Sequence, residues 1–138
     1  EAIESHYLEV DTASVTFSSL GSYEHLQLRM SARHNNDGGG GHMVYLRFNS
    51  DSGGNYTTTA MNTYNGNNYN PNRYTGQTEV YGGGRPSGGL EGYNNAAYIM
   101  TGSSLWNNAA AVTSILVYPP SGDFRRGTQI SLYGIKSS

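Results

Sequence analysis

The chain has no cysteine, a single lysine and few charged residues of either sign. Without cysteine there is no disulfide framework, no thiolate metal site and no cysteine nucleophile. Its 8 basic and 10 acidic residues give a formal net charge of -2, so the global field recruits neither nucleic acid nor an anionic membrane. These absences exclude classes of function without indicating a role.

Long apolar runs are also absent. The longest are stretches of a few residues such as Ile115 to Tyr118, far below the roughly 20 residues of a membrane-spanning helix. The first residues, Glu1 to Glu4, show neither the basic nor the apolar part of a signal peptide. We therefore expect no membrane partner and no nucleic-acid partner.

Strong helix formers are scarce, whereas Gly (19), Ser (16), Asn (14) and Tyr (12) dominate the 138 residues. These four residue types have low helix propensity, which excludes a helical bundle or a coiled coil. The length suits one domain and is too short for two ordinary ones. We therefore expect residues 1–138 to form a single domain.

Alternation of polar and apolar residues predicts strands instead of helices. Each predicted strand places its apolar residues on one face, as Leu26, Leu28 and Met30 illustrate. In the candidate strand 42–49 the same alternation predicts that Val44, Leu46 and Phe48 face inward and that Met43, Tyr45 and Arg47 face outward. The clearest candidates are 14–18, 23–31, 42–49, 111–118 and 128–135, and the weaker ones are 7–11, 55–61, 78–81 and 95–100. About eight short antiparallel strands at this spacing predict an all-β sandwich that is jelly-roll-like.

Residues 62–92 differ in composition from the rest, because they are rich in Asn, Gly and Tyr and nearly lack aliphatic residues. We interpret this stretch as one long loop inserted into the sandwich, of the kind that usually carries function. Aromatic rings and guanidinium groups are its candidate partner-binding side chains. These are Tyr64, Tyr69, Arg73, Tyr74, Tyr81 and Arg85.

Metal binding has two weak candidates. His34 and His42 flank a glycine tract and approach one another if that hairpin closes, but no third ligand is fixed by spacing. His6 and His25 alternate with core positions and are expected to be exposed. The segment around Asp51 has the oxygen-bearing side chains of a calcium loop, yet a turn is the better interpretation, because the alternating acids are missing. No metal and no cofactor are expected.

No catalytic constellation is recognisable. There is no Gly-x-Ser-x-Gly elbow, and the acidic residues Glu79 and Glu91 stand in no context that predicts a glycosidase pair. We therefore expect a protein that is not an enzyme and has no catalytic residue. Tyr, Asn, Ser and Gly suit adaptable contact loops, which leaves a protein partner and a sugar open as ligands.

Three segments carry a family resemblance. They are 14–33, 46–56 and 127–136, whose last part reads Ile130-Ser131-Leu132-Tyr133-Gly134-Ile135. In order and spacing they resemble small structural proteins of tailed-bacteriophage particles. The Asn/Gly/Tyr-rich middle of the chain resembles nothing in that family.

The resemblance implies a non-enzymatic virion component on the virion surface, built on a β-sandwich and commonly assembled as a homo-trimer. Its partners would be other virion proteins of the capsid or the tail. A capsid-decoration (cement) protein, which binds and stabilises neighbouring capsid subunits, is the first expectation. The alternative is a tail or fibre-tip module that recognises host glycans through its loops.

Overall fold

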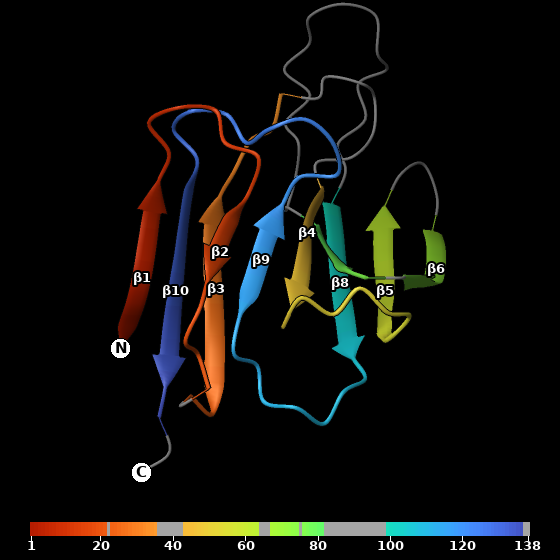
Figure 1. The fold of residues 1–138 in the computed structure, drawn as a ribbon. Coiled ribbons are helices and arrows are strands. Elements are labelled where there is room, and N and C mark those ends of the chain that lie inside the picture. The colour runs from red at the N-terminus through yellow and green to blue at the C-terminus, as the bar shows by residue number, and fades with distance from the viewer. Residues whose placement is uncertain (22, 36–42, 64–66, 75, 82–98, 137–138) are drawn as a thin grey trace, which may run out of the picture.

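All regular structure in the described part of the chain is β-strand (Figure 1). The structure, a computed structural model, describes residues 1–21, 23–35, 43–63, 67–74, 76–81 and 99–136. Its strands in chain order are β1 (Ala2–Tyr7), β2 (Val15–Phe17), β3 (His25–Ser31), β4 (Met43–Phe48), β5 (Tyr56–Thr63), β6 (Asn67–Tyr74), β7 (Thr78–Tyr81), β8 (Ile99–Trp106), β9 (Ile115–Tyr118) and β10 (Gln129–Ile135). Among these residues no helix is long and apolar enough to cross a membrane.

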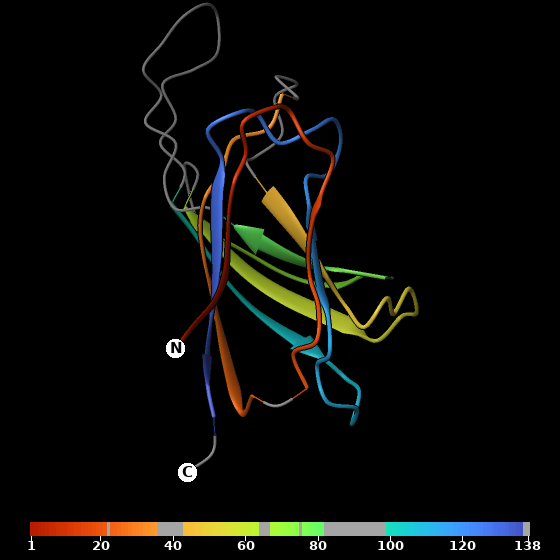
Figure 2. The same cartoon turned by 60° about the vertical axis from the view of Figure 1, so that its left-hand side comes forward.

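The strands form three antiparallel sheets. The back sheet has the order β1-β10-β3, the front sheet β2-β9-β4-β7, and the side sheet β6-β5-β8. Figure 2 shows the back sheet and the strands β2 and β9 of the front sheet as two facing layers, with the side sheet running obliquely beside them. The predicted all-β, antiparallel sandwich is therefore confirmed.

The chain crosses repeatedly between the two facing sheets. β1 and β3 belong to the back sheet and β2 and β4 to the front sheet, so the strands joined by the turn at Leu20 do not pair with each other. A jelly roll has eight strands in two sheets. The described strands form three sheets instead, since β8 pairs with β5, with Trp106 opposite Tyr56. The jelly-roll part of the prediction is therefore not confirmed.

The core lies between the front and back sheets. Phe17 and Val117 of the front sheet and Ile130 and Leu132 of the back sheet are fully buried in one cluster. The predicted inward residues of β3 and β4 pack against it, as Leu28 and Phe48 show. Burial of such side chains stabilises a domain by about 1.5–3 kcal/mol each. The alternation in the sequence therefore gave the correct faces.

The side sheet is tied to the front sheet by buried hydroxyl groups. Thr58 of β5 and Thr78 of β7 are almost fully buried, and their Oγ1 atoms are 2.9 Å apart. Thr58 Oγ1 also lies 3.0 Å from Ser104 Oγ of β8. Buried hydroxyls keep such positions only when they are hydrogen-bonded, so this triplet fixes how the side sheet joins the sandwich.

The interpretation of 62–92 as one long loop is wrong for much of its length. Residues Asn67–Tyr74 form β6 and Thr78–Tyr81 form β7, the latter matching a weaker strand candidate. β6 is an edge strand with β5 as its single neighbour in the described sheet, a place where Pro71 is tolerated. Backbone pairing with β5 overrides the low strand propensity of Asn and Pro in this segment. Residues 82–92 lie outside the described part.

Some strand limits also differ from the prediction. β1 covers Ala2–Tyr7, so the candidate strand 7–11 shares only Tyr7 with it, although the Leu8 N–H still donates to Thr128 O at 2.9 Å. β9 begins only at Ile115, so the apolar residues before it are not strand. Apolar character alone does not show where pairing starts, since a loop residue can contact the core equally well.

His6 is a second correction, because it lies on the core side of β1. It is opposite Ile130, its ring meets the Phe17 ring edge-on at 5.2 Å, and its Nε2 is 2.8 Å from Glu4 Oε1. The pairing register shifts between Ala2 and Glu4, and this irregularity changes which residues face inward. His25 is exposed, as predicted.

Gly134 lets an aromatic ring lie directly on the back sheet. A Cβ at this position would overlap Tyr23 Cδ1 and lie 2.6 Å from its Cε1 and 2.8 Å from Ile3 Cδ1. We expect Gly134→Ala to lower the free energy of unfolding by about 1–3 kcal/mol, because the ring must move. Chemical denaturation measures this. Gly54→Ala, with nothing within 4 Å, is the control and should change it by less than about 0.5 kcal/mol. Equal effects of the two variants would contradict the packing argument.

Candidate functional site: contact surfaces of the sandwich

The predicted partner-binding residues fall on two strands and outside the described part. Tyr69, Arg73 and Tyr74 belong to β6, and Tyr81 ends β7. The other two, Tyr64 and Arg85, lie outside the described residues. The candidate contact set is therefore carried largely by paired backbone instead of by a loop.

The three predicted partner-binding residues of β6 differ in the residues of β5 that lie opposite them. Tyr69 is opposite Met61 and Arg73 is opposite Thr57, whereas Tyr74 is opposite Tyr56, whose side chain is fully buried. Along β6, Tyr69 and Arg73 are four positions apart, and Tyr74 directly follows Arg73.

The candidate metal and acid residues are not brought together in the described structure. His34 is buried and forms an isolated bridge with Phe124, while His42 lies outside the described residues. Glu79 is in β7, and Glu91 is outside the described part. No group of three or more potential metal ligands occurs among the residues that the structure describes.

Asp51 holds a turn together, as the turn interpretation predicted. Its Oδ1 accepts the Gly53 N–H at 2.8 Å, and its Oδ2 accepts Asn55 Nδ2 at 2.9 Å and Trp106 Nε1 at 2.8 Å. These hydrogen bonds lower the pKa of Asp51 to about 2, and the bond from Asn55 has the largest effect. The positive φ angles in this turn belong to Asn49 (50°) and Ser50 (57°), not to a glycine.

The depressed pKa of Asp51 predicts a loss of stability in acid. The carboxylate stabilises the fold above its ordinary pKa of 3.8, and this contribution is lost as the pH falls from 3.8 to about 2. Melting temperatures of wild type and Asp51→Asn measured across this range give the test. The difference between the two proteins should shrink as the pH falls, whereas a difference independent of pH would contradict the argument.

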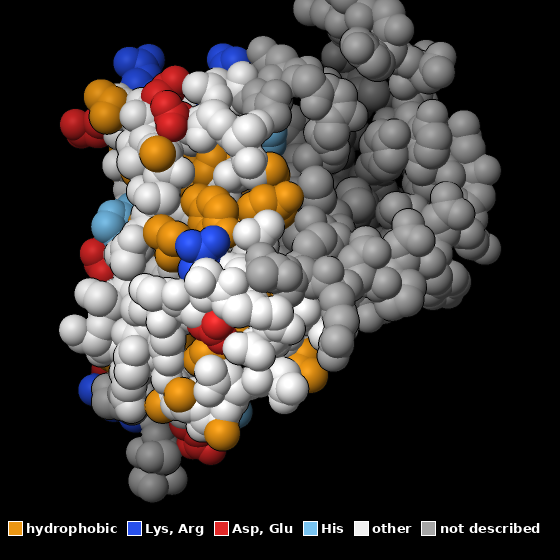
Figure 3. All heavy atoms as spheres, turned by 45° about the vertical axis from the view of Figure 1, so that its right-hand side comes forward, with side chains coloured by type: hydrophobic (Ala, Val, Ile, Leu, Met, Phe, Trp, Pro, Cys, Tyr) orange, Lys and Arg blue, Asp and Glu red, His pale blue; other side chains and the backbone are white. Residues whose placement is uncertain are grey.

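Sequence reasoning missed a cluster on the outer face of the front sheet. Tyr45 and Arg47 of β4 are opposite Tyr118 and Leu116 of β9, and all four side chains are partly exposed. We call these four residues with Gln77 the outer aromatic patch. Figure 3 shows hydrophobic side chains around a basic one on this part of the surface.

The patch is rigid. The Tyr45 and Tyr118 rings meet edge-on with centroids 5.6 Å apart. Tyr118 donates its hydroxyl to Gln77 Oε1 at 2.8 Å and accepts Arg47 Nη2 at 3.2 Å. Alternation predicted that Tyr45 and Arg47 face outward, but no pattern in the sequence links β4 to Tyr118.

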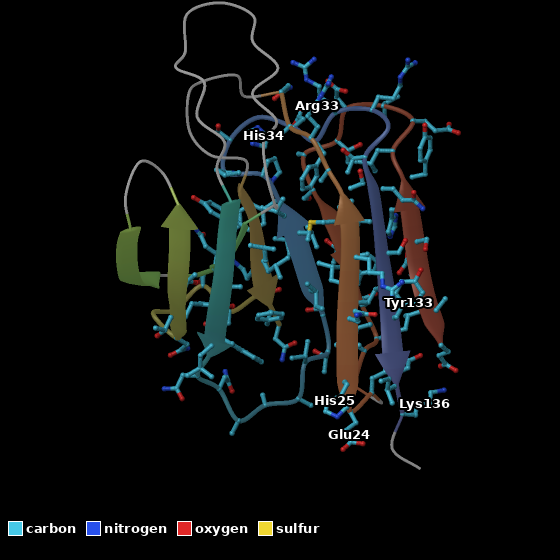
Figure 4. The ribbon with its side chains drawn as sticks, turned by 180° about the vertical axis from the view of Figure 1, so that it is seen from behind. Glu24, His25, Arg33, His34, Tyr133 and Lys136 are labelled. Carbon is cyan, nitrogen blue, oxygen red and sulfur yellow. The ribbon has the colours of Figure 1, made fainter. Side chains whose placement is uncertain are left out.

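The opposite surface of the molecule, the outer face of the back sheet, has a second arginine–tyrosine pair. The Arg29 guanidinium lies 5.0 Å from the centroid of the Tyr133 ring. Figure 4 shows Tyr133 on this face, with Glu24, His25 and Lys136 toward one end of the sheet and Arg33 and His34 toward the other. This pair provides an internal comparison for the outer aromatic patch.

Comparisons of the chain with protein-family models, with curated proteins and with solved structures found no match. The arguments for function therefore depend on the residues and geometry described above.

Proposed function

We propose that the chain is a non-enzymatic structural protein of a virion surface, a capsid-decoration protein that binds and stabilises neighbouring capsid subunits. One observation supports this assignment above the others. Strands β2, β3 and β10 of the two facing sheets lie in the segments that resemble phage structural proteins. The side sheet comes almost wholly from the part without resemblance, which also supplies β7 and β9 of the front sheet.

The division follows the strands. β2, β3 and β10, which lie in the resembling segments, belong to the facing front and back sheets. β6 and β8, in the remaining part, belong to the side sheet, and β5 joins them. A sandwich framework with an appended sheet is an arrangement that suits a protein whose contacts are made by the appended part.

The edge strand β6 is the proposed contact element. It has eight residues and, among the described strands, a neighbour on one side only. Unpaired backbone groups of an edge strand pair readily with another chain. Tyr69 and Arg73 add residue types that dominate protein interfaces. A trimer would repeat these contacts and convert modest affinity into avidity.

Binding to particles tests the proposal. Purified chain added to capsids that lack it should bind and raise their resistance to heat, and the Y69A/R73E variant should bind weakly because both side chains are on the contact strand. Tyr7→Ala changes a tyrosine that is 66% exposed on the back sheet and serves as the control. Absence of binding by the wild-type chain would overturn the proposal.

A second function is favoured by the outer aromatic patch, namely that of a tail or fibre-tip module binding host glycans. Tyrosine rings beside an amide and a guanidinium group suit a sugar, whose apolar ring face and hydroxyls need both kinds of contact. Labelling the protein on an intact particle separates the capsid from the tail location, and a glycan array with no hits would remove this alternative.

A further inference from the structure

The guanidinium of Arg47 is held in place more firmly than an ordinary surface arginine. Its Nε donates to Gly76 O at 2.6 Å and its Nη2 to Tyr118 Oη at 3.2 Å, and Cζ lies 5.5 Å from the Tyr118 ring centroid. Gly76 is fixed in turn, since its N–H donates to Gly53 O at 2.7 Å. Its φ of 81° and a Cβ position 3.2 Å from the Ser52 backbone require glycine there.

This fixed positive charge has no counter-ion among the described side chains. The ion pairs there join His6 to Glu4 and Lys136 to Glu1, and the contacts of Arg47 are with uncharged groups. Its bonds within the described residues use Nε and Nη2, so Nη1 has both of its hydrogens without a partner in that part of the chain. A half-buried arginine with free donors in a protein of net charge -2 indicates an anionic ligand.

The Arg29–Tyr133 pair on the back sheet shows that stacking on a tyrosine ring does not by itself orient an arginine as Arg47 is oriented. Arg29 is exposed, and its Nε donates to Gln27 Oε1, two residues away on the same strand, at 3.1 Å. This hydrogen bond of Arg29 therefore stays within β3, and its contact with a second strand is the stacking on Tyr133. Arg47 is oriented by groups on β9 and on the turn before β7, which lowers the entropy lost when a ligand binds.

We propose that the outer aromatic patch binds a pyranose carrying a carboxylate, a sugar acid of the hexuronate or sialic acid class. The free N–H groups of Arg47 would take the carboxylate as a bidentate pair. The Tyr45 ring would contact the apolar face of the sugar ring, and the Gln77 amide would donate to its hydroxyls. This inference rests on the glycan-binding alternative and names its ligand class.

Two features favour an acidic sugar over a simple anion. The planes of the Tyr45 and Tyr118 rings meet at 77°, close to a right angle, so the patch presents a ring face beside a ring edge. Gln77 is oriented by the Tyr118 hydroxyl at 2.8 Å, and its amide nitrogen has no hydrogen-bond partner among the described residues, so it can donate to a ligand. A free carboxylate such as acetate would use Arg47 alone, whereas a sugar acid uses all three groups.

Chemical-shift perturbation of the full chain by 3′-sialyllactose and by galacturonic acid oligomers is the test. Lactose is the neutral counterpart and acetate the anion without a ring. At least one acidic sugar should shift the amides of β4 and β9 and bind about 10-fold or more tightly than lactose, because charge-assisted bonds are the stronger ones. Arg47→Gln should remove this preference, and Arg29→Gln should leave it unchanged.

Further variants separate binding from folding. Arg47→Lys keeps the charge and loses the bidentate geometry, so it should recover only part of the preference. Tyr45→Ala should weaken all sugars alike. Glu79 is opposite Tyr45 on β7, and Glu79→Gln should bind the acidic sugars at least as tightly as wild type. Far-ultraviolet circular dichroism and the melting temperature confirm that each variant is folded.

The outcomes distinguish this inference from glycan binding in general. Equal binding of acidic and neutral sugars at the patch overturns the sugar-acid inference and leaves the glycan alternative standing. Absence of binding by every sugar overturns both. Shifts produced equally by acetate overturn the requirement for a ring, and shifts produced by acidic peptides alone transfer the patch to a protein partner.

Discussion

Replacing Phe17 by alanine should lower the free energy of unfolding by about 3–5 kcal/mol. Phe17 is fully buried in the middle of the core, and its ring is also in edge contact with His6 of the facing sheet. The loss is a large fraction of the 5–15 kcal/mol that stabilises a typical domain. Equilibrium unfolding in urea, followed by circular dichroism, measures the change.

Leu105→Ala is the matched control for this core variant. Leu105 is 61% exposed, so its truncation removes little buried area and should change the free energy of unfolding by less than about 0.5 kcal/mol. A Phe17→Ala protein no less stable than Leu105→Ala would contradict the placement of the core between the front and back sheets.

Replacing Tyr56 by alanine should also lower the free energy of unfolding by about 3–5 kcal/mol. The loss would come from ring packing and from the hydrogen bonds of the hydroxyl. Tyr56 is fully buried, and its ring stacks on Phe48 with centroids 6.3 Å apart. Its hydroxyl donates to Asp51 O at 3.0 Å and accepts the Phe48 N–H at 3.1 Å. Burial also raises the pKa of Tyr56.

Tyr56→Phe isolates the hydroxyl. It keeps the ring and leaves the Phe48 N–H and the Asp51 carbonyl without this partner, which should cost about 1–3 kcal/mol and speed amide hydrogen exchange in the turn at Asp51. Tyr7→Phe, at a tyrosine 66% exposed, should change neither quantity. If the two phenylalanine variants were equally stable, the hydroxyl bonds would contribute nothing to folding.

The strands of the front and back sheets could be predicted because the alternation of polar and apolar residues within each strand shows which side chains are buried. Leu26, Leu28 and Met30 alternate with polar residues, and that period alone places them on the face that packs against the core. β6 could not be predicted in this way. Its Asn-rich sequence is typical of a loop, and its strand structure depends on an eight-residue register with β5 that leaves no period of apolar residues.

The candidate sites depended on tertiary structure even more. Asp51 bonds Trp106, 55 residues away, and Arg47 bonds Tyr118, 71 residues away. Alternation predicted the face on which Tyr45 and Arg47 lie and said nothing of what is opposite them. His6 was placed on the wrong face because the shift of register near Ala2 leaves no mark in a short strand.

By itself, the sequence determined what is scarce: no cysteine, little charge and few helix formers, from which an all-β domain followed. It also determined which faces of the framework strands are buried, because burial of apolar area is a local consequence of composition and period. Which strands pair, where β6 ends the side sheet, and which distant residues surround Arg47 were decided only by the tertiary structure. Pairing joins backbone groups that are common to all residues, so their partners are set by the packing of the whole fold.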